Sequence, residues 1–96
     1  MTDSDLTGAN LDGANMSGAI AKRTVLVEAC LANAQLTGID LSDANLTNAS
    51  LNGADLRHAN LRGAILEGAD LSNAMLKDAD VTVEQLAQAT GIYTIE

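Results

Sequence analysis

Leucine recurs at every fifth position along most of the chain, in one register that runs from residue 6 to residue 81. Leucine fills 13 of these 16 positions, and Met16, Ala21 and Val81 fill the others, so none is charged. A second register, two residues earlier, holds alanine at 13 of its 16 positions. The repeating unit is therefore Ala-(Asp/Asn)-Leu-x-(Gly/Asn/Asp). The repeated leucines, which we expect to form the core, are Leu6, Leu11, Leu26, Leu31, Leu36, Leu41, Leu46, Leu51, Leu56, Leu61, Leu66, Leu71 and Leu76.

A five-residue period fits neither a regular helix nor a flat strand. On an α-helix, five residues turn the chain by about 500°, so successive leucines would scatter around the cylinder. On a strand, an odd spacing sends successive leucines to opposite faces. Within one repeat, however, the alanine and the leucine share a face, and the final Gly, Asn or Asp is typical of a turn. The pattern predicts short extended pieces joined by corners, in a chain that winds around an axis.

The run from about Leu6 to Val81 resembles the pentapeptide-repeat proteins. Typical units are Ala44-Asn45-Leu46-Thr47-Asn48 and Ala69-Asp70-Leu71-Ser72-Asn73. The resemblance implies an all-β solenoid, a right-handed quadrilateral β-helix with four repeats per coil and about four coils. Leucines would then stack twenty residues apart. Residues 20–30 carry arginine, valines and a glutamate where small polar residues are usual, so we expect a bulged corner or a distorted coil there.

The two ends of the chain differ in their expected caps. We assign residues 1–82 to the repeat and residues 83–96 to a C-terminal capping helix and tail. Thr82 and Gln85 match a capping box, which predicts a short α-helix from about Val83 to Ala89 that Gly91 closes. Residues 92–95 alternate as an extended tail would. The N-terminus shows no comparable cap, so the first coil is either exposed, paired with a second chain, or continued in a longer protein.

Composition and charge exclude several classes. The 96 residues indicate one domain, and a single cysteine forms no internal disulfide. No apolar run approaches the roughly 20 residues of a membrane span and no export signal is visible, so we expect a cytoplasmic protein with no membrane partner. Thirteen acidic against five basic residues give a formal charge of −8. Without a basic stripe or stacking aromatics, direct nucleic-acid binding is not expected.

With four sides per coil, the charges divide unevenly. All five basic residues fall on the third and fourth sides, where they balance the acidic residues. The first two sides carry no base and sum to −5. Their carboxylates either merely solvate the surface or form an acidic face for a basic partner. The acidic residues of these two sides are Asp5, Asp12, Glu28, Glu67 and Asp70.

The chain offers little for catalysis, metal binding or cofactors. His58 stands alone in an outward corner, and Cys30 is either a small filler or an exposed thiol. The recurring Asp and Asn before each leucine are explained better by bonds to the neighbouring turn backbone than by a metal ladder. No glycine-rich phosphate loop is present. We therefore expect no cofactor, no metal and no enzymatic activity.

Outward apolar residues mark the candidate contact surface. Val25, Val27 and Ile65 share the first side with Glu28 and Glu67. Scattered surface apolar residues are common, so this set is either a chance patch or a protein-contact surface. A homodimer through an uncapped coil or through this side is a further hypothesis.

Three functional hypotheses remain. The first is a non-catalytic structural or protein-interaction module with an unidentified protein partner. The second, implied by a branch of the resembling family, is a DNA-mimicking inhibitor or protection protein of a topoisomerase such as gyrase; net acidity favours it, and the short rod with two balanced sides argues against it. The third is a hydrolase, which the lack of candidate catalytic residues disfavours. Repeats of this type are abundant in cyanobacteria, so we expect a cyanobacterial source.

Overall fold

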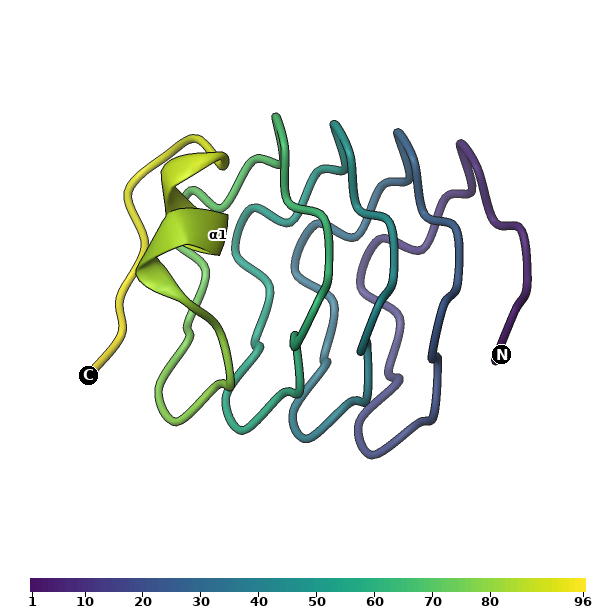
Figure 1. Ribbon diagram of the computed structural model, residues 1–96, viewed down its shortest axis with the longest axis horizontal. Coiled ribbons are helices and arrows are strands. Elements are labelled where there is room, and N and C mark those ends of the chain that lie inside the picture. The colour runs from purple at the N-terminus through teal and green to yellow at the C-terminus, as the bar shows by residue number, and fades with distance from the viewer.

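Parallel pairing between residues twenty apart organises the whole molecule. A computed structural model describes residues 1–96. Its parallel β-bridges form columns along the molecule; in one of them Asp5 pairs with Val25, Val25 with Asn45, and Asn45 with Ile65. The coils stack along one axis, with the N-terminus at one end and the single helix at the other (Figure 1). The molecule measures 29 × 24 × 23 Å. The five-residue pattern has therefore produced a solenoid in which a full turn takes twenty residues.

Each repeat ends in a tight corner that side chains hold in place. The alanine N–H of one repeat donates to the leucine carbonyl of the repeat before, as from Ala54 to Leu51 at 3.0 Å. The Asp or Asn before the leucine accepts the N–H two residues on, as Asp70 Oδ1 does from Ser72 at 2.9 Å. The last residue of most repeats has a positive φ. The prediction that these Asp and Asn side chains bond to the turn backbone is confirmed.

The interior is a continuous column of leucine and alanine. Twenty-two buried apolar residues form one cluster, with Ile39 and Ala21 in it. Of the predicted core leucines, Leu26 to Leu76 are at most 2% exposed. Leu6 and Leu11 are only half-buried, because the first coil has a neighbouring coil on one side alone. Alanine in the second register lets the coils close tightly, since a larger side chain would overfill the column.

The predicted distortion at residues 20–30 is wrong. Ile20, Val25 and Cys30 bridge to residues twenty further on without interruption. The unusual side chains occupy outward or corner positions, where solvent accepts them and where Arg23 and Glu28 adopt φ values of 56° and 60°. A polar residue in the alanine register is also accommodated. The coil therefore keeps its shape, because only the inward registers restrict side-chain size.

Thr24 shows how the alanine register tolerates a hydroxyl. The residue is fully buried, and its Oγ1 donates to the Met1 carbonyl at 2.7 Å. A buried hydroxyl costs little when it is hydrogen-bonded. The bond also fastens the first residue of the chain to the second coil.

The α-helix α1, Val83–Ala87, lies at the C-terminal end of the solenoid (Figure 1). Its capping box is confirmed, because Gln85 N–H donates to Thr82 Oγ1 at 3.1 Å and Thr82 N–H donates to Gln85 Oε1 at 2.8 Å. The helix ends two residues before the predicted Ala89, with Gln88 as its C-cap. Gly91 does not close it. At five residues, α1 is neither long nor apolar enough to cross a membrane.

Residues 89–95 continue the solenoid after α1. Thr90 pairs with Asp70 and Thr94 pairs with Met75. Gly91, at φ 90°, turns the chain directly over Ser72, where a Cβ would come within 2.6 Å of the Ser72 backbone nitrogen. The tail predicted as extended is thus paired with the last coil, and with α1 it covers that end of the column.

Candidate protein-contact surface

We define side 1 as residues 4–8, 24–28, 44–48 and 64–68, which stack in consecutive coils. Val25 and Ile65 lie in one outward column with Asn45 between them. They are therefore two coils apart, about 10 Å at the usual spacing of paired strands. Ile65 is 47% exposed, whereas Val25 and Val27 are half-buried. The apolar residues predicted as a surface lie on the same side but are separated.

A polar pair separates the two apolar regions of side 1. Asn45 Oδ1 accepts the Thr47 N–H at 3.1 Å and the Thr47 hydroxyl at 2.6 Å. These bonds link the two polar side chains within the repeat. Side 1 therefore has two apolar regions, one at Val25 and Val27 and one at Ile65.

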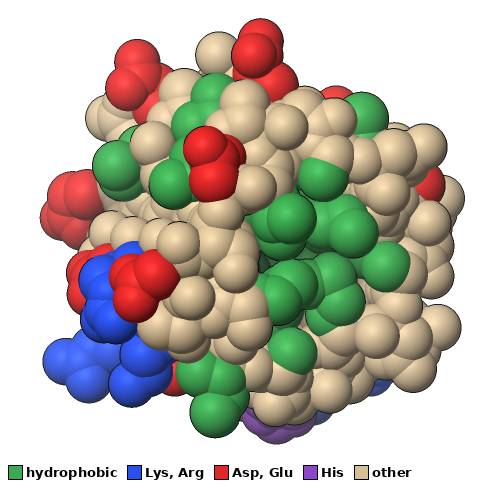
Figure 2. Space-filling model, turned by 90° about the vertical axis from the view of Figure 1, so that its right-hand side faces the viewer, with side chains coloured by type: hydrophobic (Ala, Val, Ile, Leu, Met, Phe, Trp, Pro, Cys, Tyr) green, Lys and Arg blue, Asp and Glu red, His purple; other side chains and the backbone are tan.

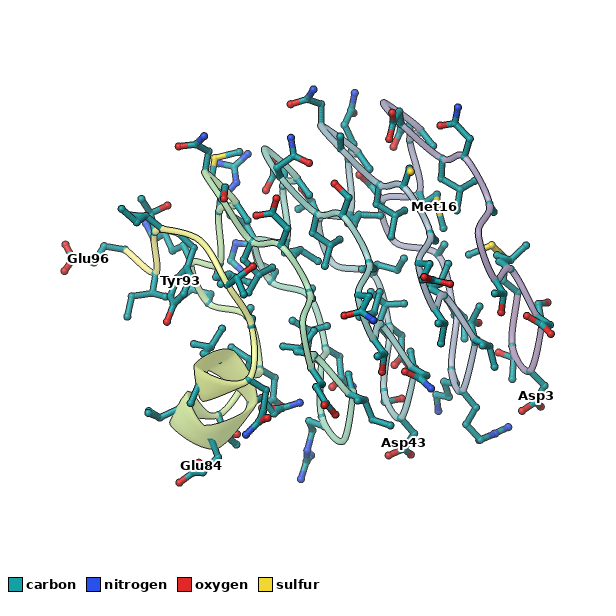
Figure 3. All side chains as sticks on the ribbon, turned by 90° about the horizontal axis from the view of Figure 1, so that it is seen from above. Asp3, Met16, Asp43, Glu84, Tyr93 and Glu96 are labelled. Atoms are coloured by element: carbon teal, nitrogen blue, oxygen red, sulfur yellow. The ribbon has the colours of Figure 1, made fainter.

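A groove lies where α1 diverges from side 1. It has a volume of about 360 Å³ and is lined by Ile65, Glu67 and their neighbours from the coil and by residues of the helix. Gln85 anchors the helix beside it, because its Nε2 donates to the Leu61 carbonyl at 2.6 Å and to the Ala64 carbonyl at 2.9 Å. Glu84 lies on the outer side of α1 and points away from the coils (Figure 3). The full lining comprises Ala64, Ile65, Leu66, Glu67, Glu84, Gln85 and Gln88.

The groove extends the predicted surface with residues that the sequence did not indicate. The capping box gave the position of the helix along the chain, but it did not show how the helix would lie against the last coil. Glu84 and Gln88 were therefore missed as candidates. The bonds from Gln85 to two coil carbonyls fix that placement, and they exist only in the folded molecule.

Ion pairs engage most basic residues away from side 1. Arg23 lies 2.8 Å from Asp3, Arg57 lies 2.6 Å from Asp55, and Arg62 and Lys22 lie 3.6 and 3.9 Å from aspartates of the next coil. Exposed pairs of this kind contribute little to stability, but they cancel the local charge. No such partner faces the carboxylates of the first two sides, which are Asp5, Asp12, Glu28, Glu67 and Asp70.

Hydrogen bonds keep several carboxylates ionised. The Thr7 hydroxyl and N–H lower the pKa of Asp5, and the Ser72 hydroxyl and N–H lower the pKa of Asp70. The Arg57 side chain lowers the pKa of Asp55 to about 2. Asp5 and Asp70, which lie on the acidic sides, therefore stay charged well below neutral pH, without a cation to neutralise them.

The remaining candidates for chemistry, His58 and Cys30, lie on different sides of the solenoid. His58 Nδ1 lies 3.8 Å from Asp78 Oδ2, and both side chains are more than half exposed. Cys30 is exposed, in a column between Asn10 and Ser50. No group of three or more His, Cys, Asp or Glu side chains is arranged to hold a metal ion.

Comparison with known proteins agrees with this description. A family model for pentapeptide repeats matches residues 4–43 and 39–78, and the chain belongs to the pentapeptide-repeat family. Its fold is therefore a right-handed β-helix solenoid with a small cap helix. A search of curated protein sequences finds no match.

Three solved structures show the extent of the similarity. The chain is similar to Rfr23, a pentapeptide repeat protein from the cyanobacterium Cyanothece 51142, at 34% identity and a TM-score of 0.80, covering 96% of this chain and 60% of Rfr23. A pentapeptide repeat protein from Nostoc Pcc 7120 is 29% identical, with a TM-score of 0.44 and coverage of 92% and 80%. QnrB1, a plasmid-mediated fluoroquinolone resistance protein, is 21% identical, with a TM-score of 0.40 and coverage of 99% and 62%. The chain thus spans about three fifths of Rfr23.

Proposed function

We propose that the chain is a non-catalytic protein-interaction module that binds a basic partner on side 1. The observation that carries the proposal is the group of carboxylates that no cation pairs: Asp5, Glu28 and Glu67 on side 1, with Asp12 and Asp70 on the adjacent side. Elsewhere on the surface, four of the five Lys and Arg side chains are engaged by aspartates. An acidic surface attracts a basic partner over distances of about a Debye length and so speeds association.

The groove beside α1 supplies the chemistry for recognising such a partner. Ile65 offers an exposed apolar contact, and Glu67 follows it by two residues on the same side. A lysine or arginine stem packs on apolar surface while its charged end reaches a carboxylate. We propose that the groove accepts a basic residue next to an apolar one. We also propose that the solenoid is a four-sided rod of about four coils. The β-bridges between residues twenty apart support this shape.

Fluorescence anisotropy with labelled short peptides tests the proposal. Peptides that alternate lysine and leucine are expected to bind, and the same peptides with glutamate in place of lysine are not. Glu67→Lys is expected to raise Kd by about tenfold, since it reverses a charge in the groove. Glu96→Lys changes the net charge equally but lies outside side 1, so it serves as the control. Equal losses in both variants would show attraction to net charge alone and would overturn the proposal.

The non-catalytic assignment is also part of the proposal. It is supported by the His58–Asp78 pair and by Cys30: the pair is exposed and contains no thiol or hydroxyl nucleophile, and Cys30 lies on a different side of the solenoid. A screen of hydrolase substrates is expected to show no turnover above buffer. Turnover that follows the purified protein and disappears in a His58→Ala variant would contradict it.

A second candidate function is inhibition or protection of gyrase by DNA mimicry. The formal charge of −8 favours it, since a DNA mimic must present phosphate-like charge. The balanced third and fourth sides restrict that charge to half of the surface. Purified gyrase in a supercoiling assay decides the question: inhibition at micromolar protein would favour this function over the first, and unchanged supercoiling would eliminate it.

We also infer a cytoplasmic location and a cyanobacterial source. The similarity to the cyanobacterial Rfr23 supports the source. Fractionation of cells that express the native gene tests the location, with recovery in the membrane or exported fraction as the contradicting result.

A further inference from the structure

The first coil presents its apolar interior to solvent. Its inward residues are half-buried, whereas the equivalent residues one or two coils later are buried. Hydrophobic side chains gather at the centre of this end of the molecule, inside a polar and charged rim (Figure 2). The inward residues of this coil are Leu6, Ala9, Leu11, Ala14, Met16 and Ala19.

The backbone of the same coil presents unpaired groups at regular intervals. In the second coil, Val25 uses both its groups, donating to the Ser4 carbonyl at 2.8 Å and accepting from Leu6 at 2.7 Å. The corresponding residues of the first coil are Asp5, Asn10 and Asn15, and neither the N–H nor the carbonyl of any of them has a backbone partner. An edge of this kind is a template for pairing with another strand.

The other end of the solenoid has no matching edge. There α1 and residues 89–95 cover the last coil, with Thr90 and Thr94 paired to it. Stacking of copies head to tail would require that covered end, so a filament is blocked. Two copies can still meet through their first coils about a two-fold axis.

We propose that a second copy of this chain covers the first coil, in a head-to-head dimer. A two-fold axis through the middle of the edge places Asn10 opposite Asn10 of the second copy, and Asp5 opposite Asn15 of the second copy. Each pair then exchanges two backbone hydrogen bonds in antiparallel fashion. The fourth side of the coil takes no part, since the Met1 ammonium already donates to the Ile20 carbonyl at 3.1 Å.

The size of the end face suits such a dimer. The cross-section of 24 by 23 Å limits the end face to about 550 Å² per copy, or roughly 1,100 Å² in total, which is close to the roughly 1,000 Å² expected of a specific interface. The charge at the rim is modest. Asp3 is paired with Arg23, which leaves Asp5 and Asp12 as the uncompensated carboxylates near the contact. Added salt should therefore strengthen association by screening them.

Sedimentation equilibrium of the 96-residue chain tests the proposal. The expected mass is twice 9.8 kDa, with tighter association at higher salt. Leu11→Lys is expected to weaken dimerisation by about tenfold or more, because each dimer loses two apolar contacts. Ile65→Lys, on side 1, is the matched control and should leave the dimer intact. A monomer at high concentration, or a dimer lost only in Ile65→Lys, would overturn the proposal.

Cross-linking keeps the proposal testable if Leu11→Lys does not fold. In a Cys30→Ser background, Asn10→Cys places two thiols beside the two-fold axis, and a short bismaleimide is expected to join them efficiently. Ser17→Cys, on the same coil but away from the axis, is expected to cross-link poorly. Equal yields at the two positions would contradict the proposed symmetry.

Discussion

Gly53 and Gly38 occupy equivalent corners of interior coils, yet their surroundings differ. Both have a left-handed backbone, at φ 72° and 68°. A Cβ added at Gly53 would collide with Asn33 Oδ1 of the previous coil and lie 3.3 Å from Asn33 Cγ, whereas a Cβ at Gly38 meets nothing within 4 Å. Alanine at the two positions therefore separates the cost of the corner conformation from the cost of stacking corners.

The expected losses follow from two terms. A left-handed alanine costs about 1–2 kcal/mol, and both variants pay it. Gly53→Ala must also push the Asn33 side chain away from its rotamer, which costs about 0.5–1.5 kcal/mol. We expect Gly53→Ala to be the less stable variant, with a Tm lower than that of Gly38→Ala by about 2–12 °C for a domain of this size.

Urea unfolding of both variants measures the difference. The double variant Asn33→Gly with Gly53→Ala removes the obstructing side chain and keeps a residue suited to the corner. The free energy of unfolding of the double variant is then compared with that of Asn33→Gly alone. We expect the loss of stability caused by Gly53→Ala to be smaller in this background, close to the loss caused by Gly38→Ala. Equal losses for the two alanine variants, or no recovery in the double variant, would refute the stacking argument.

Three further predictions concern charge, core and cap. Because the folded pKa of Asp55 is about 2, below its usual value of 3.8, its stabilisation is present above pH 4 and lost as the pH falls toward 2. Asp55→Asn should thus cost roughly 1–2 kcal/mol in urea unfolding at pH 7 and little at pH 2, and an equal cost at both would contradict the linkage. Ala54→Leu should overfill the column and cost about 1–3 kcal/mol, whereas Asn52→Ala should cost less than about 1 kcal/mol; equal melting midpoints would disprove the inward position of Ala54. Gln85→Ala should lower stability by about 1–2 kcal/mol and speed hydrogen exchange in the last coil, unlike the control Glu84→Ala.

The contact surface was only partly predictable from the sequence. Four repeats per coil, which the family resemblance implies, make a turn of twenty residues, and this turn places Val25, Ile65 and Glu67 on one side. The position of Asn45 between Val25 and Ile65 could also have been predicted from the sequence, by counting in steps of twenty residues. The groove could not be predicted, because it depends on how α1 packs against the last coil. That packing is fixed by the hydrogen bonds from Gln85 to Leu61 and Ala64, which lie 24 and 21 residues earlier in the sequence.

At residues 20–30, departures from the repeat consensus led to the wrong prediction of a distorted coil. Arg23 and Glu28 differ from the usual corner residues, and the difference suggested an irregular coil. The backbone there is held by hydrogen bonds to coils on both sides: the Cys30 N–H donates to the Ala9 carbonyl of the coil before, and the Leu31 N–H donates to the Ser50 carbonyl of the coil after. Those bonds outweigh the modest preference of Arg or Glu against a positive φ, so the corner keeps its shape.

The sequence was enough to predict the solenoid, its inward residues, its capping box and, with the four sides that the family resemblance implies, its uneven charge, because these follow from residue types at fixed spacings. It also predicted a cap at the C-terminal end and none at the N-terminal end, but the contacts made at the two ends depend on the tertiary structure. At one end, α1 and the tail find carbonyls and amides of the last coil and cover them. At the other, the first coil keeps its donors, acceptors and apolar centre exposed, because the order of residues along the chain does not show which backbone groups lack a partner in space.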